Sequence, residues 1–126
     1  MEKIVTIDGR DIGFKATART PRIYRHRIGR DMVADMNKLR KAYNKAAKLP
    51  KKATEEEIQD AQLSEIDLEI FENVAWVMAK QYDDSIENGP DEWLDTFNTF
   101  SIYEILPNIL QLWAINTATT SKPKKK

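Results

Sequence analysis

The chain of 126 residues contains no cysteine, a single histidine and only four glycines. The lack of cysteine excludes a disulfide, which suits a reducing cytoplasm, and one histidine cannot assemble an ordinary zinc site. There is no run of about 18 apolar residues, so we expect no transmembrane helix and no membrane partner. The first residues, MEKIVTIDGR, also lack the basic-then-apolar pattern of a signal peptide.

The residues needed for catalysis are equally scarce. The four glycines are isolated from one another, so no glycine-rich phosphate loop exists. His26 lies among arginines, and no nucleophile, base and orienting group can be assembled around it. The acidic pairs Asp83-Asp84 and Asp91-Glu92 lack the spacing of an EF-hand. We therefore expect a protein that is not an enzyme, with no catalytic residue, cofactor or metal site.

The net charge is zero, but the charges are segregated along the chain. Residues 1–52 hold 15 Lys and Arg against 5 Asp and Glu, residues 53–104 hold 1 against 15, and residues 105–126 hold 4 against none. These segments carry net charges of +10, −14 and +4. Either the basic and acidic parts pack against each other within one monomer, or they meet in separate molecules, through self-association or a charged partner.

Hydrophobic periodicity predicts a mainly α fold, a small helical domain with an N-terminal β-hairpin. Lys3–Ile7 and Ile12–Ala18 flank an Asp-Gly pair, which is typical of a hairpin turn. A lone hairpin is marginally stable, so it should lie on the helices, with a free edge available for assembly. We expect residues 1–115 to form the domain and residues 116–126 to be a disordered Lys-rich tail.

The segment Leu63–Tyr82 is predicted to be the central helix. Ser64 followed by Asp67 is a helix-start signature, and two adjacent apolar rows follow. Such a wide stripe indicates a helix enclosed by other elements. Phe71 should lie deep in the core.

Start and stop signals predict the remaining helices. Thr20 as the cap and Pro21 begin a short helix that Gly29 ends, and Asp31 starts a second helix to about Ala47. A linker at residues 48–53 precedes a short acidic helix from Thr54. A helix from Pro90 should run through Phe100, and Ser101 should cap a last helix, Ile102–Trp113, with a kink or a shifted start at Pro107.

Two stretches are candidate partner sites. Helices 90–113 carry more large apolar side chains than a domain of this size must hide. Most should be core, and some could form a groove for an apolar partner helix; the candidates are Trp93, Phe97, Phe100, Tyr103, Leu106, Leu110 and Trp113. Residues 19–30 hold five arginines and could mimic a helix-turn-helix, but Asp31 and Asp35 open its second helix and oppose nucleic acid.

Three segments resemble a known family: IDGRDIGFKATARTPRIYRHRIGRD, IDLEIFENVAWVMAKQ and EWLDTFNTFSIYEILPNILQLW. Over residues 3–115 the chain is similar to the tail assembly chaperones of long-tailed phages and prophages of Gram-positive bacteria. The resemblance implies a helical, non-enzymatic protein of the infected bacterial cytoplasm that is absent from the mature virion. It would bind the tape-measure protein, keep it soluble, and help tail-tube subunits polymerise around it.

The resemblance also implies a second, longer product. Such chaperones are often made in two lengths by ribosomal frameshifting, and the codons of Lys124–Lys126 are candidates for the slippage site. The extension would recruit the tail-tube protein. The alternative function is a nucleic-acid-binding regulator that uses residues 19–30.

Overall fold

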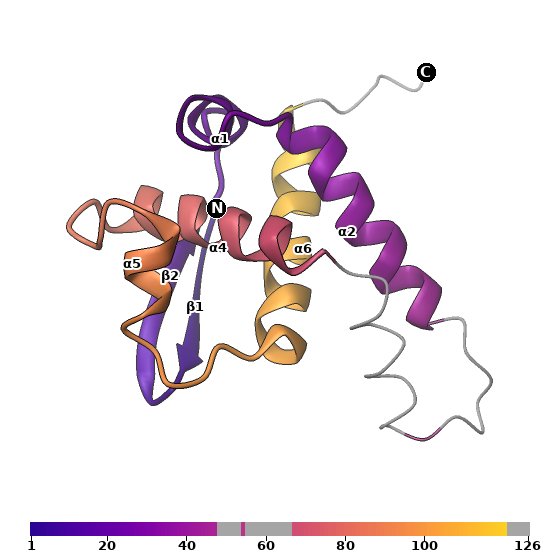
Figure 1. Ribbon diagram of the computed structural model, residues 1–126. Coiled ribbons are helices and arrows are strands. Elements are labelled where there is room, and N and C mark those ends of the chain that lie inside the picture. The colour runs from indigo at the N-terminus through magenta and orange to yellow at the C-terminus, as the bar shows by residue number, and fades with distance from the viewer. Residues whose placement is uncertain (48–53, 55–66, 121–126) are drawn as a thin grey trace, which may run out of the picture.

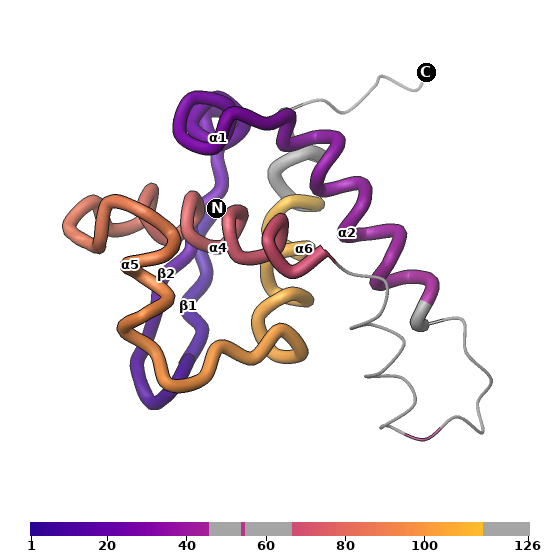
Figure 2. The backbone as a smooth tube through the Cα atoms, viewed as in Figure 1, coloured from indigo at the N-terminus to yellow at the C-terminus, as the bar shows by residue number. Residues whose placement is uncertain are grey.

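The computed structural model describes residues 1–47, 54 and 67–120 (Figures 1 and 2). A two-stranded sheet, β1 and β2, comes first in the chain and is followed by the helices α1, α2, α4, α5 and α6. The predicted fold class, a mainly helical domain with an N-terminal hairpin, is confirmed.

The hairpin joins β1 (Glu2–Ile7) to β2 (Arg10–Lys15) in antiparallel register, with Ile7 opposite Arg10. Asp8 and Gly9 both have positive φ, 54° and 76°, the backbone that a two-residue type I′ turn requires. This is why the Asp-Gly pair predicted the hairpin correctly. One face, with Phe14 fully buried, packs into the core.

The tip of the hairpin is tied to a distant part of the chain. The Arg10 guanidinium donates to the carbonyl and hydroxyl oxygens of Thr96 (3.1 and 3.0 Å) and lies 4.2 Å from the centre of the Phe97 ring. The Asn98 amide donates to the Asp8 carboxylate (2.9 Å). These bonds hold the turn against the segment that follows α5.

Helix α1 spans Thr20–Ile28 and ends where predicted, because Gly29 adopts φ 83° and its amide donates to the Tyr24 and Arg25 carbonyls. Thr20 is the first helical residue and not the cap, which corrects the prediction. Its hydroxyl instead accepts from the Thr17 amide (2.8 Å) and donates to Gln81 (2.6 Å), fixing α1 to α4.

Helix α2 spans Met32–Ala47, preceded as predicted by Asp31, whose carboxylate accepts from the Val33 amide (3.1 Å). Its apolar row is buried at Met32, Met36 and Leu39. The predicted linker at 48–53 and the acidic helix that begins after Thr54 lie outside the described residues.

Helix α4 is the central element, as predicted, but it spans Leu68–Tyr82 and does not begin near Leu63. Asp67 is the cap itself: its backbone is extended, and its carboxylate accepts from the Glu69 and Ile70 amides (3.1 and 3.3 Å). The Asp67 carboxylate therefore marks the N-terminal boundary of α4. The sequence pattern instead predicts Asp67 in the first turn of the helix. Ser64 lies outside the described residues.

Seven consecutive residues of α4, Val74–Lys80, are buried. The helix contacts β2, α1, α2, α5 and α6, and Figure 1 shows it crossing in front of the hairpin. Its C-terminal residue is fitted to the sheet, because a Cβ at Gly13 would overlap the Tyr82 ring. Any larger residue at position 13 would have to displace the Tyr82 ring from this position.

The C-terminal part departs from prediction at the end of α5 and at the end of α6. Helix α5, Pro90–Leu94, ends before Phe97 and Phe100, because the Thr96 hydroxyl bonds back to the Trp93 carbonyl (2.7 Å) and the chain turns. Helix α6, Ile102–Thr120, begins where predicted with Pro107 inside it, so its start is not shifted. A kink there stays a prediction.

Helix α6 continues to Thr120, past its predicted end at Trp113, because the residues after Trp113 extend a helix already nucleated upstream. The predicted division into a domain at residues 1–115 and a Lys-rich tail at residues 116–126 stays a prediction. Residues 121–126, including Lys124–Lys126, lie outside the described residues.

The burial of Phe71 gives the first testable outcome. Phe71 is 1% exposed and lies 5.6 Å from the Phe100 ring. We expect Phe71→Ala to lower the free energy of unfolding by about 3–5 kcal/mol, through lost transfer energy and a cavity. Urea denaturation measures this, with the exposed Val33→Ala as the control that should change little. An unchanged midpoint for Phe71→Ala contradicts the placement of α4.

Candidate partner-binding surface

The seven predicted partner-binding residues divide into a buried and a half-buried group. Trp93 and Leu106 are 1% exposed, and Phe97 and Trp113 are 9% exposed, so these four belong to the core. Phe100, Tyr103 and Leu110 are half-buried at its boundary. The expectation that most of the set is core is therefore correct, and only the second group can meet a partner without unfolding.

The buried aromatics form one cluster. The Trp93 ring makes edge contacts with Phe97 (5.2 Å between centroids) and Phe100 (5.3 Å), and Phe100 also contacts Phe71. Such tilted and edge-to-face pairs are the favourable geometry for aromatic rings. The cluster explains the high aromatic content of residues 93–100: it fills the space between α4, α5 and the start of α6.

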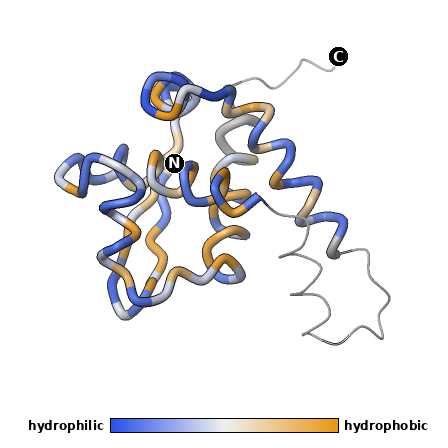
Figure 3. Tube along the Cα trace, viewed as in Figure 1, coloured by the Kyte–Doolittle hydropathy of each residue, from blue (hydrophilic) through white to orange (hydrophobic). Residues whose placement is uncertain are grey.

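The half-buried apolar side chains of α6 share one face. Tyr103, Pro107 and Leu110 follow one another at the i, i+4, i+7 spacing of a helix stripe, and all three are half-buried. We call them the α6 stripe. Figure 3 shows that α6 is largely hydrophobic along its length, in contrast to the hydrophilic α1. The stripe is a candidate apolar contact surface.

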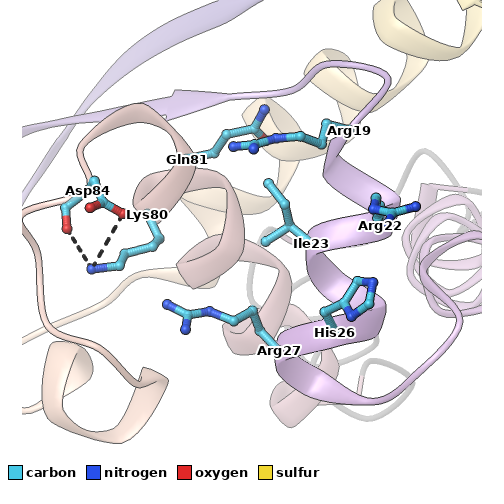
Figure 4. A pocket seen from close by; sticks show the side chains of 8 residues that line it. All are labelled: Arg19, Arg22, Ile23, His26, Arg27, Lys80, Gln81 and Asp84. Atoms are coloured by element: carbon cyan, nitrogen blue, oxygen red, sulfur yellow. Dashed lines mark hydrogen bonds and ion pairs between the residues drawn. The ribbon is translucent and has the colours of Figure 1, made fainter.

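A basic groove lies between α1 and the C-terminal half of α4 (Figure 4). It has a volume of about 340 Å³, and its uncharged lining residues are Ile23 and Gln81. Its other lining residues are charged or titratable: Arg19, Arg22, His26, Arg27, Lys80 and Asp84. Arg27 also lies over the Trp76 ring, 5.3 Å from its centroid. We call this site the basic groove.

An acidic hollow adjoins the basic groove, and Arg27 lines both. It measures about 280 Å³ and lies between α1, α4 and α5. Glu69, Glu72 and Asp91 give it its charge. The pKa of Glu72 is raised by burial and then by the neighbouring carboxylates of Glu69, Asp91 and Asp67.

The ion pair between Arg30 and Asp35 is structural, with the Asp35 side chain buried and the Arg30 side chain 48% exposed. The Arg30 guanidinium donates through two nitrogens to the two carboxylate oxygens of Asp35 (2.7 and 2.8 Å), and the Tyr24 hydroxyl donates to the same carboxylate (2.7 Å). The hydrogen bonds from Arg30 hold the pKa of Asp35 below its usual range, whereas burial raises the pKa of Tyr24. Asp35 is thus buried and would not face a nucleic acid bound to α1 and α2. Its charge is therefore no argument against nucleic-acid binding, which corrects that part of the prediction from sequence.

Lys80, a buried charged residue that lines the basic groove, has a structural role. Its ammonium, on the buried face of α4, donates to the carbonyls of Asp84 and Ile86 and to the Asn88 side chain (2.6, 2.8 and 3.0 Å). The Trp76 indole donates to the Glu87 carbonyl (3.0 Å). Both residues hold the loop between α4 and α5 in place.

Neither a metal cluster nor a membrane-crossing helix occurs in the described part of the chain. Within those residues, no group of three or more His, Asp or Glu side chains could hold a metal ion. No helix there is both long and apolar enough to cross a bilayer. Comparisons of this chain with family models, curated proteins and solved structures found no match.

Sequence reasoning found the charges but not the two hollows. Arg19, Arg22, His26 and Arg27 follow helical spacing, which predicts that they share one face of α1 and its cap. That this face lies beside Lys80 and Gln81 of α4 depends on tertiary packing. The acidic hollow joins Glu69 and Glu72 to Asp91, which is on a different helix. Only the contact between α4 and α5 brings them together.

The Asp35 network gives a pH-dependent outcome. We expect Asp35→Asn to cost about 2–3 kcal/mol at pH 7, because two charge-assisted bonds are weakened in a buried site. The pKa of Asp35 is lower in the folded chain than in the unfolded chain, so this stabilisation is present above about pH 4 and is lost as the pH falls through the folded-state pKa.

Thermal denaturation between pH 2 and pH 7 compares Asp35→Asn with the native chain. The difference in melting temperature should shrink towards acid. The exposed Asp95→Asn is the matched control and should show a small effect. A difference that stays constant from pH 7 to pH 2 contradicts the stabilisation by the Asp35 charge.

Proposed function

We propose that this protein is a phage tail assembly chaperone that binds the tape-measure protein without catalysing a reaction. The proposal rests on the resemblance of residues 3–115 to that family, and the α6 stripe is the structural observation that supports it. A tape-measure protein is a long, partly apolar helical chain that aggregates when its apolar face is exposed. A chaperone for it needs an apolar contact surface that remains accessible in the folded state.

The α6 stripe fits that requirement. Tyr103 and Leu110 are spaced by two helical turns on one face. Both pack against the core but remain partly exposed, whereas Trp93 and Leu106 are 1% exposed. An apolar partner helix laid along α6 would bury both side chains and Pro107, in the manner of helix-in-groove recognition. Glu104 and Gln111 are exposed beside the stripe and supply a polar rim.

The alternative, a nucleic-acid-binding regulator, draws on the basic groove. Arg19, Arg22 and Arg27 are exposed, and Asp35 is turned away from them. The acidic hollow beside the groove opposes this alternative, since carboxylates next to the contact surface repel a polyanion. We therefore place nucleic acid second.

A longer form would add the tail-tube protein as a second partner. We propose that frameshifting at the codons of Lys124–Lys126 yields an extension that recruits tail-tube subunits while the shared domain holds the tape measure. Tethering would raise the local concentration of subunits along the tape measure. The gene sequence tests this point, because the absence of an A-rich slippery run or of an overlapping downstream frame rejects it.

The stripe gives the decisive experiment for tape-measure binding. We expect Tyr103→Ala combined with Leu110→Ala to weaken binding of purified tape-measure protein at least tenfold, measured by pull-down and titration. The double variant should remain folded and lose less stability than Phe71→Ala, because both side chains are only half-buried. Gln111→Ala on the exposed side of α6 is the matched control and should bind normally. Unchanged binding by the folded double variant contradicts the assignment of the stripe.

A further inference from the structure

Only a limited part of the opposite charge on the two chain segments meets within the described residues, chiefly where Asp67 lies beside Lys38 and Lys41 of α2. The ion pairs in the described part of the chain are Arg30–Asp35, inside the basic segment, and Lys80–Asp84, inside the acidic segment. None of the described ion pairs joins one segment to the other. Arg19 and Arg22 of the basic groove and Glu69 and Asp91 of the acidic hollow are exposed and are not in the described ion pairs.

The carboxylates of the acidic hollow repel one another in the monomer, which disfavours their charged forms. Glu72 is half-buried beside Glu69 and Asp91, and like charges in a partly desolvated site repel each other. Arg27 lines the same hollow, yet it makes no ion pair with these carboxylates among the described residues. A cluster of this kind is relieved when an external cationic group enters it.

The basic groove supplies such groups in the required form. Arg19, Arg22 and Arg27 are exposed along one face of α1, and guanidinium groups pair with carboxylates through two parallel hydrogen bonds. Each surface also has apolar lining residues, Ile23 in the groove and Ile28 with Leu94 in the hollow. Charged rims around an apolar centre are typical of protein interfaces.

The two surfaces adjoin, because Arg27 lines both. When complementary patches lie side by side on one face, a two-fold axis between two copies places each patch of one copy against the opposite patch of the other. We propose that this protein forms a two-fold dimer in which the basic groove of each copy takes the acidic rim of its partner's acidic hollow. The occupant is a second copy of this chain, selected by charge complementarity.

Charge reversal on each side tests the dimer. One variant carries Arg19→Glu and Arg22→Glu, and the other carries Glu69→Lys and Asp91→Lys; all four residues are exposed. The native chain should sediment as a dimer in 20 mM salt and as a monomer in 0.5 M salt, where screening shortens electrostatic reach. Each variant alone should be monomeric in 20 mM salt, with a dissociation constant raised more than tenfold.

Mixing supplies the specific readout. In an equimolar mixture of the two variants every contact is again between opposite charges, so a one-to-one dimer should reappear in 20 mM salt. Arg40→Glu with Lys41→Glu, on the exposed face of α2, makes the same change in net charge and should leave the dimer intact. Circular dichroism on each variant checks that the fold is retained, and Glu69→Gln with Asp91→Asn replaces a reversal that fails to fold.

Several outcomes would overturn the proposal. These are a native chain that stays monomeric at high concentration in 20 mM salt, variants that associate as the native chain does, or a mixture that stays monomeric. Retention of a short DNA duplex by the native monomer, lost in Arg19→Glu with Arg22→Glu, would assign the groove to nucleic acid instead. The tape-measure proposal is judged separately, because the α6 stripe is a different surface and its double alanine variant should still dimerise.

Discussion

The enclosure of α4 is the constraint on which the rest of the structure depends. A helix with seven consecutive buried residues cannot lie at a surface, so every other element must supply part of a wall around it. With few helices available in a short chain, the hairpin provides one wall, and Gly13 lets the sheet approach close enough for Tyr82 to lie on it. The aromatic cluster of Trp93, Phe97 and Phe100 completes another.

Local signals in the sequence were sufficient for the fold class and for elements fixed by backbone chemistry. Asp8-Gly9 predicted the turn and Gly29 the end of α1, because each needs a positive φ that few residues adopt. The predictions were wrong where a polar side chain could serve either as a helix cap or in another hydrogen bond. Asp67 caps α4 where a first-turn role was expected, and Thr20 bonds to Gln81 on another helix and leaves the cap to Arg19.

The candidate site was less predictable than the fold for the same reason. Apolar spacing marks Trp93 and Tyr103 equally, yet one is core and the other half-buried, since the difference arises from which elements cover them. The charge segregation was plain in the sequence, but its partition into a basic groove and an acidic hollow depends on how α1 and α5 meet α4. The same helical scaffold thus presents the α6 stripe, and separately the adjoining basic groove and acidic hollow.

The anchoring of the hairpin tip has a consequence for synthesis on the ribosome. The hairpin emerges before the segment that anchors it, because the partners of Asp8 and Arg10 lie 90 and 86 residues later in the chain. At translation rates of about 5–20 residues per second, this wait lasts roughly 5–20 s. During that time the tip of the hairpin lacks these tethers and is open to cellular chaperones or to a neighbouring nascent chain.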